Sequence, residues 1–139
     1  MDMKTTFDAN MIMVELLNKA KVNEAISGDI YVDGSRPLNS KHEDIVVNVV
    51  ALQADSLPQS ASSNINIYVP DKVIKIGVKN QQVANIIRLK EITDIIMGVI
   101  RSTIVPGLSI TPVSQTIMEE STLKQHFSNI RLSWNIQID

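Results

Sequence analysis

The spacing of apolar residues near the start of the chain predicts an amphipathic helix. Apolar side chains recur at intervals of three and four residues, which places them on one helical face: Ala9, Ile12, Met13, Leu16, Leu17 and Ala20. Asp8 or Asn10 is expected to cap the helix, because a short polar side chain can accept a hydrogen bond from a free first-turn N–H. Gly28 is expected to stop it, and residues 1–8 are expected to form a short flexible tail.

The pattern changes to that of strands between residues 29 and 69. Residues 29–33 predict a short strand, and residues 44–53 predict a strand that is apolar on both faces apart from Asn48, as is typical of a central strand covered on both sides. Residues 54–63, "ADSLPQSASS", are small, polar and proline-bearing, so they predict a mobile loop. Residues 64–69 alternate apolar and polar side chains, which predicts a third strand.

Residues 71–80 are compatible with either a short strand or an extended loop arm. After them, residues 81–103 predict a second helix, whose apolar arc consists of Ile86, Leu89, Ile92, Ile95, Ile96, Val99 and Ile100. Val83 and Ile87 fall among the polar positions of this helix instead. They indicate either a helix start covered by a neighbouring loop or a contact with a partner.

The last third of the chain predicts a hairpin, with strands over 110–118 and 126–138 and a turn near 119–125. Strict alternation places two sets of side chains on opposite faces of the final strand. The apolar set is Ile130, Leu132, Trp134, Ile136 and Ile138, and the mixed set is Phe127, Asn129, Arg131, Ser133, Asn135 and Gln137. One face should pack against the core, and the other should meet water or a partner.

The order of these elements is α-β-β-β-α-β-β, which predicts a single α+β domain over residues 1–139. The sheet should be antiparallel or mixed, with two helices packed on one face. A chain of 139 residues with 44% hydrophobic residues can bury one core without help from cross-links. It has no cysteine, so disulfides and thiolate metal sites are excluded.

Charge and composition argue against nucleic acids and membranes as binding partners. A net charge of −2 and an aromatic content of 4% argue against nucleic-acid recognition, which relies on clustered Lys and Arg and on stacking platforms. No run approaches the roughly 18 apolar residues of a membrane span, and the N-terminus lacks a secretory pattern. The expected partners are therefore proteins, with no membrane and no nucleic-acid sequence to recognise.

No catalytic signature accompanies this pattern. His42 and His126 are the two histidines, and they lack the spacing of a metal site. The nucleophile elbow, the phosphate-binding lysine loop and the dinucleotide glycine motif are all missing from the sequence. The adjacent carboxylates in 43–44 and 119–120 should point to opposite faces, which makes them poor acid–base pairs. We expect no enzyme, no metal and no cofactor.

Four stretches carry a family resemblance: "GDIYVDGSRPLNSKHEDIVVNVV", "NINIYVPD", "RLKEITDIIMGVI" and "NIRLSWNIQI". Together with the element order, they resemble the tail terminator and tail-completion proteins of long-tailed bacteriophages and prophages. The resemblance implies a virion structural protein without catalytic residues. It implies a homo-oligomeric ring, commonly a hexamer, that caps the tail tube and meets the head-completion protein. Such a protein assembles in the host bacterial cytoplasm and resides in the virion tail.

The resemblance also indicates residues for the contact. Those matching the family's hairpin loop are Tyr31, Asp33, Arg36, Pro37 and Lys41. Asp33-Gly34 favours a tight turn and Pro37 stiffens the residues after it, so we interpret residues 33–44 as a projecting hairpin loop for protein contact, with a simple solvated loop as the alternative. The segments 54–63 and 71–80 are long for so small a domain and could be lumen or inter-subunit loops.

The final strand supplies a second candidate contact. Phe127, Arg131 and Asn135 form a mixed apolar and polar row that suits the heterologous contact of a closed ring. Two other classes stay open. A monomeric adaptor or immunity-type module would stay monomeric at high concentration, and a small enzyme would gather His42, Arg36 and a carboxylate in a pocket.

Overall fold

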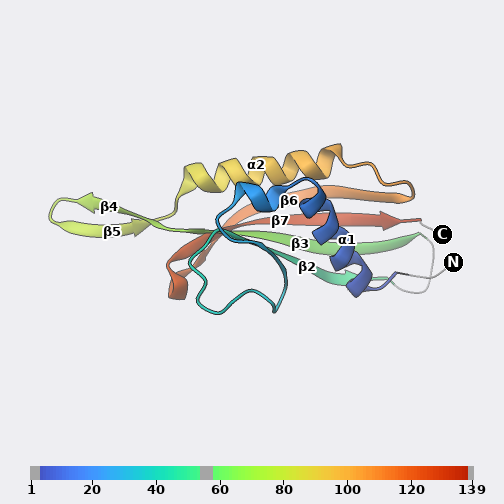
Figure 1. Ribbon diagram of the computed structural model, residues 1–139, viewed down its shortest axis with the longest axis horizontal. Coiled ribbons are helices and arrows are strands. Elements are labelled where there is room, and N and C mark those ends of the chain that lie inside the picture. Colours follow the sequence, from blue (N-terminus) through green and yellow to red (C-terminus); the bar gives the residue numbers. More distant parts are fainter. Residues whose placement is uncertain (1–3, 54–57, 138–139) are drawn as a thin grey trace.

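Two helices lie on one face of a five-stranded mixed sheet, and a separate two-stranded hairpin extends beyond the end of that sheet (Figure 1). This computed structural model describes residues 4–53 and 58–137. The α+β fold class predicted from the sequence is confirmed, and the sheet is mixed. The elements in chain order are α1 (Thr6–Lys19), the 3₁₀ helix η1 (Val22–Ala25), β1 (Ile30–Val32), β2 (Asp44–Leu52), β3 (Gln59–Pro70), β4 (Lys72–Ile76), β5 (Lys79–Val83), α2 (Ile86–Ser102), β6 (Leu108–Glu120), the 3₁₀ helix η2 (Ser121–Leu123) and β7 (Gln125–Ile136).

The strand register explains why the helices share one face. The strand order is β1-β2-β3-β7-β6, with β1 parallel to β2 and every other pair antiparallel. One register row across the sheet is Val32, Val47, Ile65, Ile130 and Gln115. Its apolar members belong to the core that both helices cover. The expectation of two helices packed on one face is therefore confirmed.

The opposite surface of the sheet, called here the open face, has a different composition. The next register row consists of Tyr31, Val46, Asn66, Asn129 and Thr116. Asn129 donates to Asn66 Oδ1 at 2.7 Å, so neighbouring strands are joined through side-chain amides on this face. The predicted alternation of the final strand is confirmed over its described residues, while Ile138 lies outside them.

The first helix begins earlier than predicted. Thr5 is its N-cap, and a capping box joins Thr5 to Asp8, so Asp8 lies inside the first turn. The expected flexible tail is thus wrong for residues 4–8, and residues 1–3 lie outside the described chain. The predicted cap Asn10 has another role, because its side chain accepts the N–H of Val49 at 3.0 Å and joins α1 to β2.

Gly28 does not stop this helix. The helix ends at Lys19, and Lys21 turns the chain into η1 with a φ of 59°. Gly28 is needed for a close approach instead, because a Cβ there would lie 1.8 Å from Asp44 Oδ1. Its own N–H donates to the carbonyl of Glu43 at 2.9 Å.

Residues 59–63 were predicted as loop, and this is wrong. They begin β3, where Ala61 pairs with Trp134 and Ser63 with Leu132. Trp134 also donates its indole N–H to the Ser63 hydroxyl at 2.8 Å in the buried core. Taken alone, the small and polar residues 59–63 are typical of a loop, but their pairing with β7 places them in the sheet. Residues 54–57 of the predicted loop lie outside the described chain.

Residues 71–83 combine the two alternatives left open for the segment after Pro70: they form strands, and those strands form an arm. Residues 79–83 are β5, so the second helix begins at Ile86 and not at residue 81. Asn85 caps the helix by accepting the N–H of Arg88. The predicted arc is also too broad, since Ile86 is 57% exposed and Ile95 39% exposed.

Candidate protein-interaction surface

The loop 33–43 is not the projecting hairpin loop that the sequence predicted. Because β1 and β2 are parallel, the chain must return along the sheet between them and cannot close a tight hairpin. The return path crosses the open face, where Asp44, Tyr68 and Phe127 lie in one register row. The hairpin expectation is wrong for this topological reason.

An ion pair fixes this loop to the sheet. Arg36 Nε donates to Asp44 Oδ2 at 2.8 Å, and the two side chains are 13% and 1% exposed. Ser40 donates its hydroxyl to the same carboxylate oxygen at 2.5 Å, and the N–H of Asp29 donates to Oδ1 at 3.2 Å. Several donors therefore converge on a carboxylate that water barely reaches, as a buried charge requires.

Arg36 has two further contacts. Its guanidinium carbon lies 4.1 Å from the centre of the Tyr68 ring, a cation–π arrangement. Gln125 accepts from Arg36 Nη2 at 3.0 Å and donates to the carbonyl of Ser40 at 2.6 Å. The candidate residue Arg36 thus holds the loop down, and its head group is not free for a partner.

Aromatic rings continue this cluster along the open face. Tyr68 and Phe127 lie with ring centroids 4.8 Å apart. Burial raises the pKa of Tyr68, and the charge of Arg36 partly opposes that rise. Burial also raises the pKa of Tyr31, and the nearby carboxylate of Asp44 adds to it. Both phenols therefore stay protonated and uncharged in neutral solution.

The predicted interface residues separate into three places. The loop presents Asp33, Pro37 and Lys41 as exposed side chains, next to Leu38, which is 93% exposed. On β7 the candidates Arg131 and Asn135 are exposed, whereas Phe127 is half-buried. β7 lies between β3 and β6, so its side chains but not its main chain are available to a partner.

The third place is the junction between the arm and α2. Val83 is a half-buried residue of β5, and Ile87 is 67% exposed in the first turn of the helix. The prediction that Val83 belongs to the helix is wrong, because Val83 pairs with Lys72 in the arm. Ile87 stays a candidate contact, beside the exposed Ile86.

The carboxylates of Glu43 and Asp44 diverge as predicted for adjacent strand residues. Asp44 turns to Arg36, whereas Glu43 receives two hydrogen bonds from Arg88 of α2, at 2.5 and 2.8 Å. The Arg88 guanidinium lowers the pKa of Glu43, against the opposing effect of burial. Arg88 was not singled out from the sequence, where it reads as one more polar residue of a helix.

The histidines do not assemble a reactive centre. His42 is exposed, and its backbone N–H donates to the Ser40 hydroxyl. His126 contacts Asp71 through Nδ1 at 2.6 Å, at the base of the arm. Within residues 4–53 and 58–137, no group of three metal-ligating side chains is close enough to hold an ion. The carboxylate of Asp44, which pairs with Arg36, accepts hydrogen bonds from three donors and is buried.

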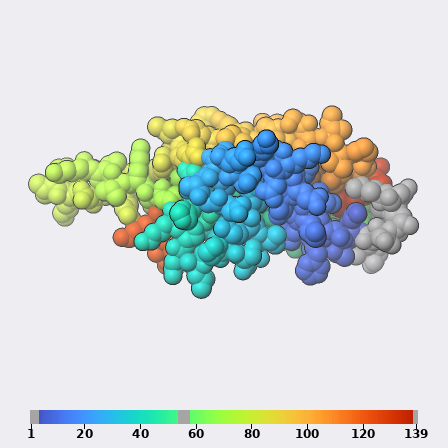
Figure 2. Space-filling view, in the orientation of Figure 1, coloured from blue at the N-terminus to red at the C-terminus, as the bar shows by residue number. Residues whose placement is uncertain are grey.

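The arm formed by β4 and β5 is highly exposed: apart from Ile74 and Val83, every residue of these two strands is exposed. Figure 2 shows its outer part extending alone from the body. Gly77 adopts a φ of 64° in the turn, a conformation that glycine accepts without strain. Val73, Ile76 and Val78 are 57%, 55% and 94% exposed, so the arm presents apolar side chains to solvent.

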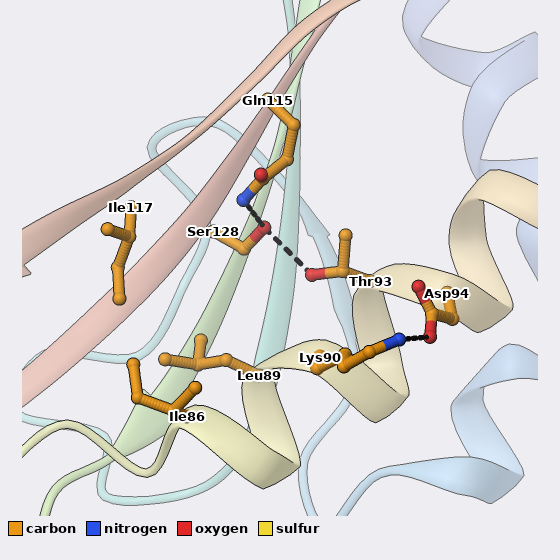
Figure 3. A pocket seen from close by; sticks show the side chains of 8 residues that line it. All are labelled: Ile86, Leu89, Lys90, Thr93, Asp94, Gln115, Ile117 and Ser128. Atoms are coloured by element: carbon orange, nitrogen blue, oxygen red, sulfur yellow. Dashed lines mark hydrogen bonds and ion pairs between the residues drawn. The ribbon is translucent and has the colours of Figure 1, made fainter.

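A groove lies between α2 and the β6–β7 hairpin (Figure 3). Its volume is about 350 Å³, and its walls are Ile86, Leu89, Lys90, Thr93, Asp94, Gln115, Ile117 and Ser128. Thr93 and Gln115 both donate to the Ser128 hydroxyl, at 2.8 and 2.9 Å, across the floor. Sequence reasoning missed this groove, because its walls come from α2 and from the β6–β7 hairpin, and no local pattern shows that these elements lie side by side.

Comparison with known proteins adds no name to this surface. No protein-family model and no curated protein matches the chain. None of the helices in the described part of the chain is long and apolar enough to cross a membrane.

Proposed function

We propose that the protein is a structural subunit that assembles with copies of itself into a ring. By its resemblance to tail terminators, the ring would cap a phage tail tube and offer a face to the head-completion protein. The observation that carries this proposal is the β4–β5 arm. It provides exposed apolar side chains on an element that serves no part of the described core.

The arm is costly unless something covers it. A two-stranded hairpin is only marginally stable alone in water, and this one is joined to the body near the Asp71–His126 contact at its base. Exposed apolar side chains on a projecting element favour a protein interface over a solvated surface. An arm that reaches away from its own subunit is suited to reach another.

The composition of the open face supports an assembly function as well. Arg131 and Asn135 are exposed there among the uncharged side chains of Ser133, Asn64 and Ser62. A closed ring needs two different patches on each subunit. The open face and the helix-side groove lie on opposite faces of the sheet, so they provide two such patches.

Solution mass together with negative-stain imaging tests the proposal. We expect a discrete oligomer by light scattering and ring-shaped particles of one diameter. A strict monomer at high concentration, with no rings, would contradict it and favour the monomeric adaptor. Binding of the rings to purified tail tubes would then test the terminator function separately.

Substitution of Arg131 tests the open face. If this row contacts a neighbour, Arg131→Glu should lower the oligomer mass, because it reverses the one charge at the centre of the row. Arg101→Glu is the matched control, since Arg101 is exposed in the last turn of α2, away from the open face. An unchanged oligomer mass in Arg131→Glu would show that the row of Phe127, Arg131 and Asn135 is not part of the contact between subunits.

A further inference from the structure

The outer edge of β6 is free along its second half. β6 is the terminal strand of the five-stranded sheet, so one side of its main chain pairs with β7 and the other with no described strand. Pro112 and a register irregularity before Ser114 interrupt the first half, and such features protect an edge from pairing. From Ser114 to Met118 the edge has no proline and no charge.

The groove adjoins this same half of β6. Ile117 faces Ile86 and Leu89 of α2 across the groove, and Gln115 points to Ser128 (Figure 3). A strand added beside β6 would direct every second side chain toward this groove. Recognition of this kind takes its affinity from main-chain hydrogen bonds and its specificity from pockets for alternate side chains.

β4 of the arm has the matching properties. One edge of β4 pairs with β5, and its other edge pairs with no described strand. Ile74 and Ile76 are two residues apart, so their side chains lie on the same face of the strand. A strand of five residues is about 17 Å long, which fits beside the seven residues 114–120 of β6.

Charge also favours the arm of a second copy as the occupant. Residues 72–83 contain three lysines and no acid, so the arm carries +3. The remaining ten Lys and Arg against fifteen Asp and Glu leave −5 on the rest of the chain. Lys90 and Asp94 both line the groove and pair with each other, so the acidic groups that face the arm are Glu119 and Glu120, which end the free edge. Within one subunit, the arm points away from the body along the long axis of the molecule (Figure 1).

We propose that β4 of one copy pairs with residues 114–120 of β6 in the next copy and places Ile74 and Ile76 over the groove. The arm and the groove are different patches, so the contact is heterologous and can repeat around a ring. This inference rests on the proposed function, because it names the contact by which the subunits of that ring would join.

Cysteine pairs give a direct test, since the natural chain has no cysteine. One chain carries Ile76→Cys and a second carries Ile117→Cys, and the two are mixed and treated with a short bismaleimide. Because each chain has a single cysteine, a link between them cannot form within one chain. We expect a covalent dimer of the two different chains, whereas Ile76→Cys with Ile104→Cys, an exposed position in the segment after α2, should give none.

Charge reversal on the arm gives a second, independent test. Lys72, Lys75 and Lys79 changed together to glutamate should shift the wild-type oligomer to monomer in light scattering. The same change at Lys19, Lys21 and Arg101 is the control, because these exposed basic residues lie outside the arm and should leave the mass unchanged.

The outcomes separate this inference from the proposed function. Rings that persist in the arm variant, with no link from Ile76→Cys to Ile117→Cys, would overturn the arm contact and leave ring assembly standing. A wild-type protein that is monomeric in the same light-scattering measurement would contradict ring assembly itself. A covalent dimer together with loss of rings in the arm variant supports both.

Discussion

Asp44 shows how one side chain organises a whole loop. It is 1% exposed, yet it accepts from Arg36, Ser40 and the N–H of Asp29. A buried carboxylate is tolerated only with such partners, because desolvation of an unpaired charge is expensive. The loop 33–43 is thereby held against the open face, although its sequence has the turn formers and charges of a solvated loop.

Asp44→Asn should destabilise the protein by about 3 kcal/mol, because Arg36 would keep its buried position without a balancing charge. The free energy of unfolding from urea titration at neutral pH measures the loss. Asp94→Asn is the matched control: its ion pair with Lys90 is exposed and should contribute less than about 1 kcal/mol. Equal losses in the two variants would show that Asp44 is not specially placed.

Gly28→Ala should cost about 1–3 kcal/mol, since a Cβ there meets the Asp44 carboxylate and lies 2.5 Å from the Glu43 carbonyl oxygen. Gly98→Ala is the opposite case, because a Cβ at this helical position has no atom within 4 Å. It should stabilise the protein by about 0.5–1 kcal/mol through helix propensity. Urea midpoints of the two variants should therefore move in opposite directions.

Among the elements, β3 and the arm that follows it differ most clearly in strand pairing and burial. β3 pairs on both sides, with β2 and β7, and its alternate residues are buried. β4 and β5 pair only with each other and have few buried apolar contacts. Local opening of a strand requires less free energy where fewer buried contacts are lost.

Hydrogen exchange should report this contrast. We expect the amides of β4 and β5 to exchange much faster than those of β3 and β7 in dilute protein, measured by mass spectrometry of peptides. At concentrations where the oligomer forms, peptides over residues 72–76 should gain protection, because β4 would then be paired on both edges. Strong arm protection in a sample shown to be monomeric would contradict this view of the arm.

Across the whole molecule, the contact between Arg88 and Glu43 joins the start of α2 to the start of β2. Arg88 also contacts Glu91 on its own helix at 3.0 Å, so one guanidinium connects two elements 45 residues apart in the chain. This contact holds the start of the helix beside the end of the sheet where the loop 33–43 leads into β2. Its contribution depends on Glu43 being ionised.

The stability should therefore fall in acid. The pKa of Glu43 is lower in the folded state than its ordinary value of 4.5, so the stabilisation is present above pH 4.5 and is lost as pH falls through the lower folded pKa. Glu43→Gln should be less stable than the natural protein by about 1 kcal/mol at pH 7. The difference should shrink toward pH 3 in urea titrations; a constant difference would contradict the assignment.

Several features of the fold could be read from local patterns, and others could not. The alternation Ile130, Leu132, Trp134 and Ile136 identified the buried face of β7 because period two is a property of the strand itself. Residues 59–63 were missed because Ser and Ala have weak local preference, and their strand state depends on β7. The helix was started five residues early at residue 81, because Gln81, Gln82 and Val83 pair across to β4.

The candidate surface was foreseen only in part. Exposure of Arg131 and Asn135 followed from strand periodicity. The positions of Arg36 and Gln125 did not, because their contact spans 89 residues of sequence. The groove between Ile86 and Ile117 was also not foreseen, because its two walls, α2 and β6, come from different segments of the chain.

The order of apolar and polar residues was sufficient for the number of core helices, the burial of β7 and the α+β class, because these depend on periodicity within one segment. The parallel pairing of β1 with β2, the path of the loop 33–43 and the free edge of β6 required the assembled sheet. Such features depend on which strands become neighbours, and neighbours are selected by packing between distant segments and not by local preference.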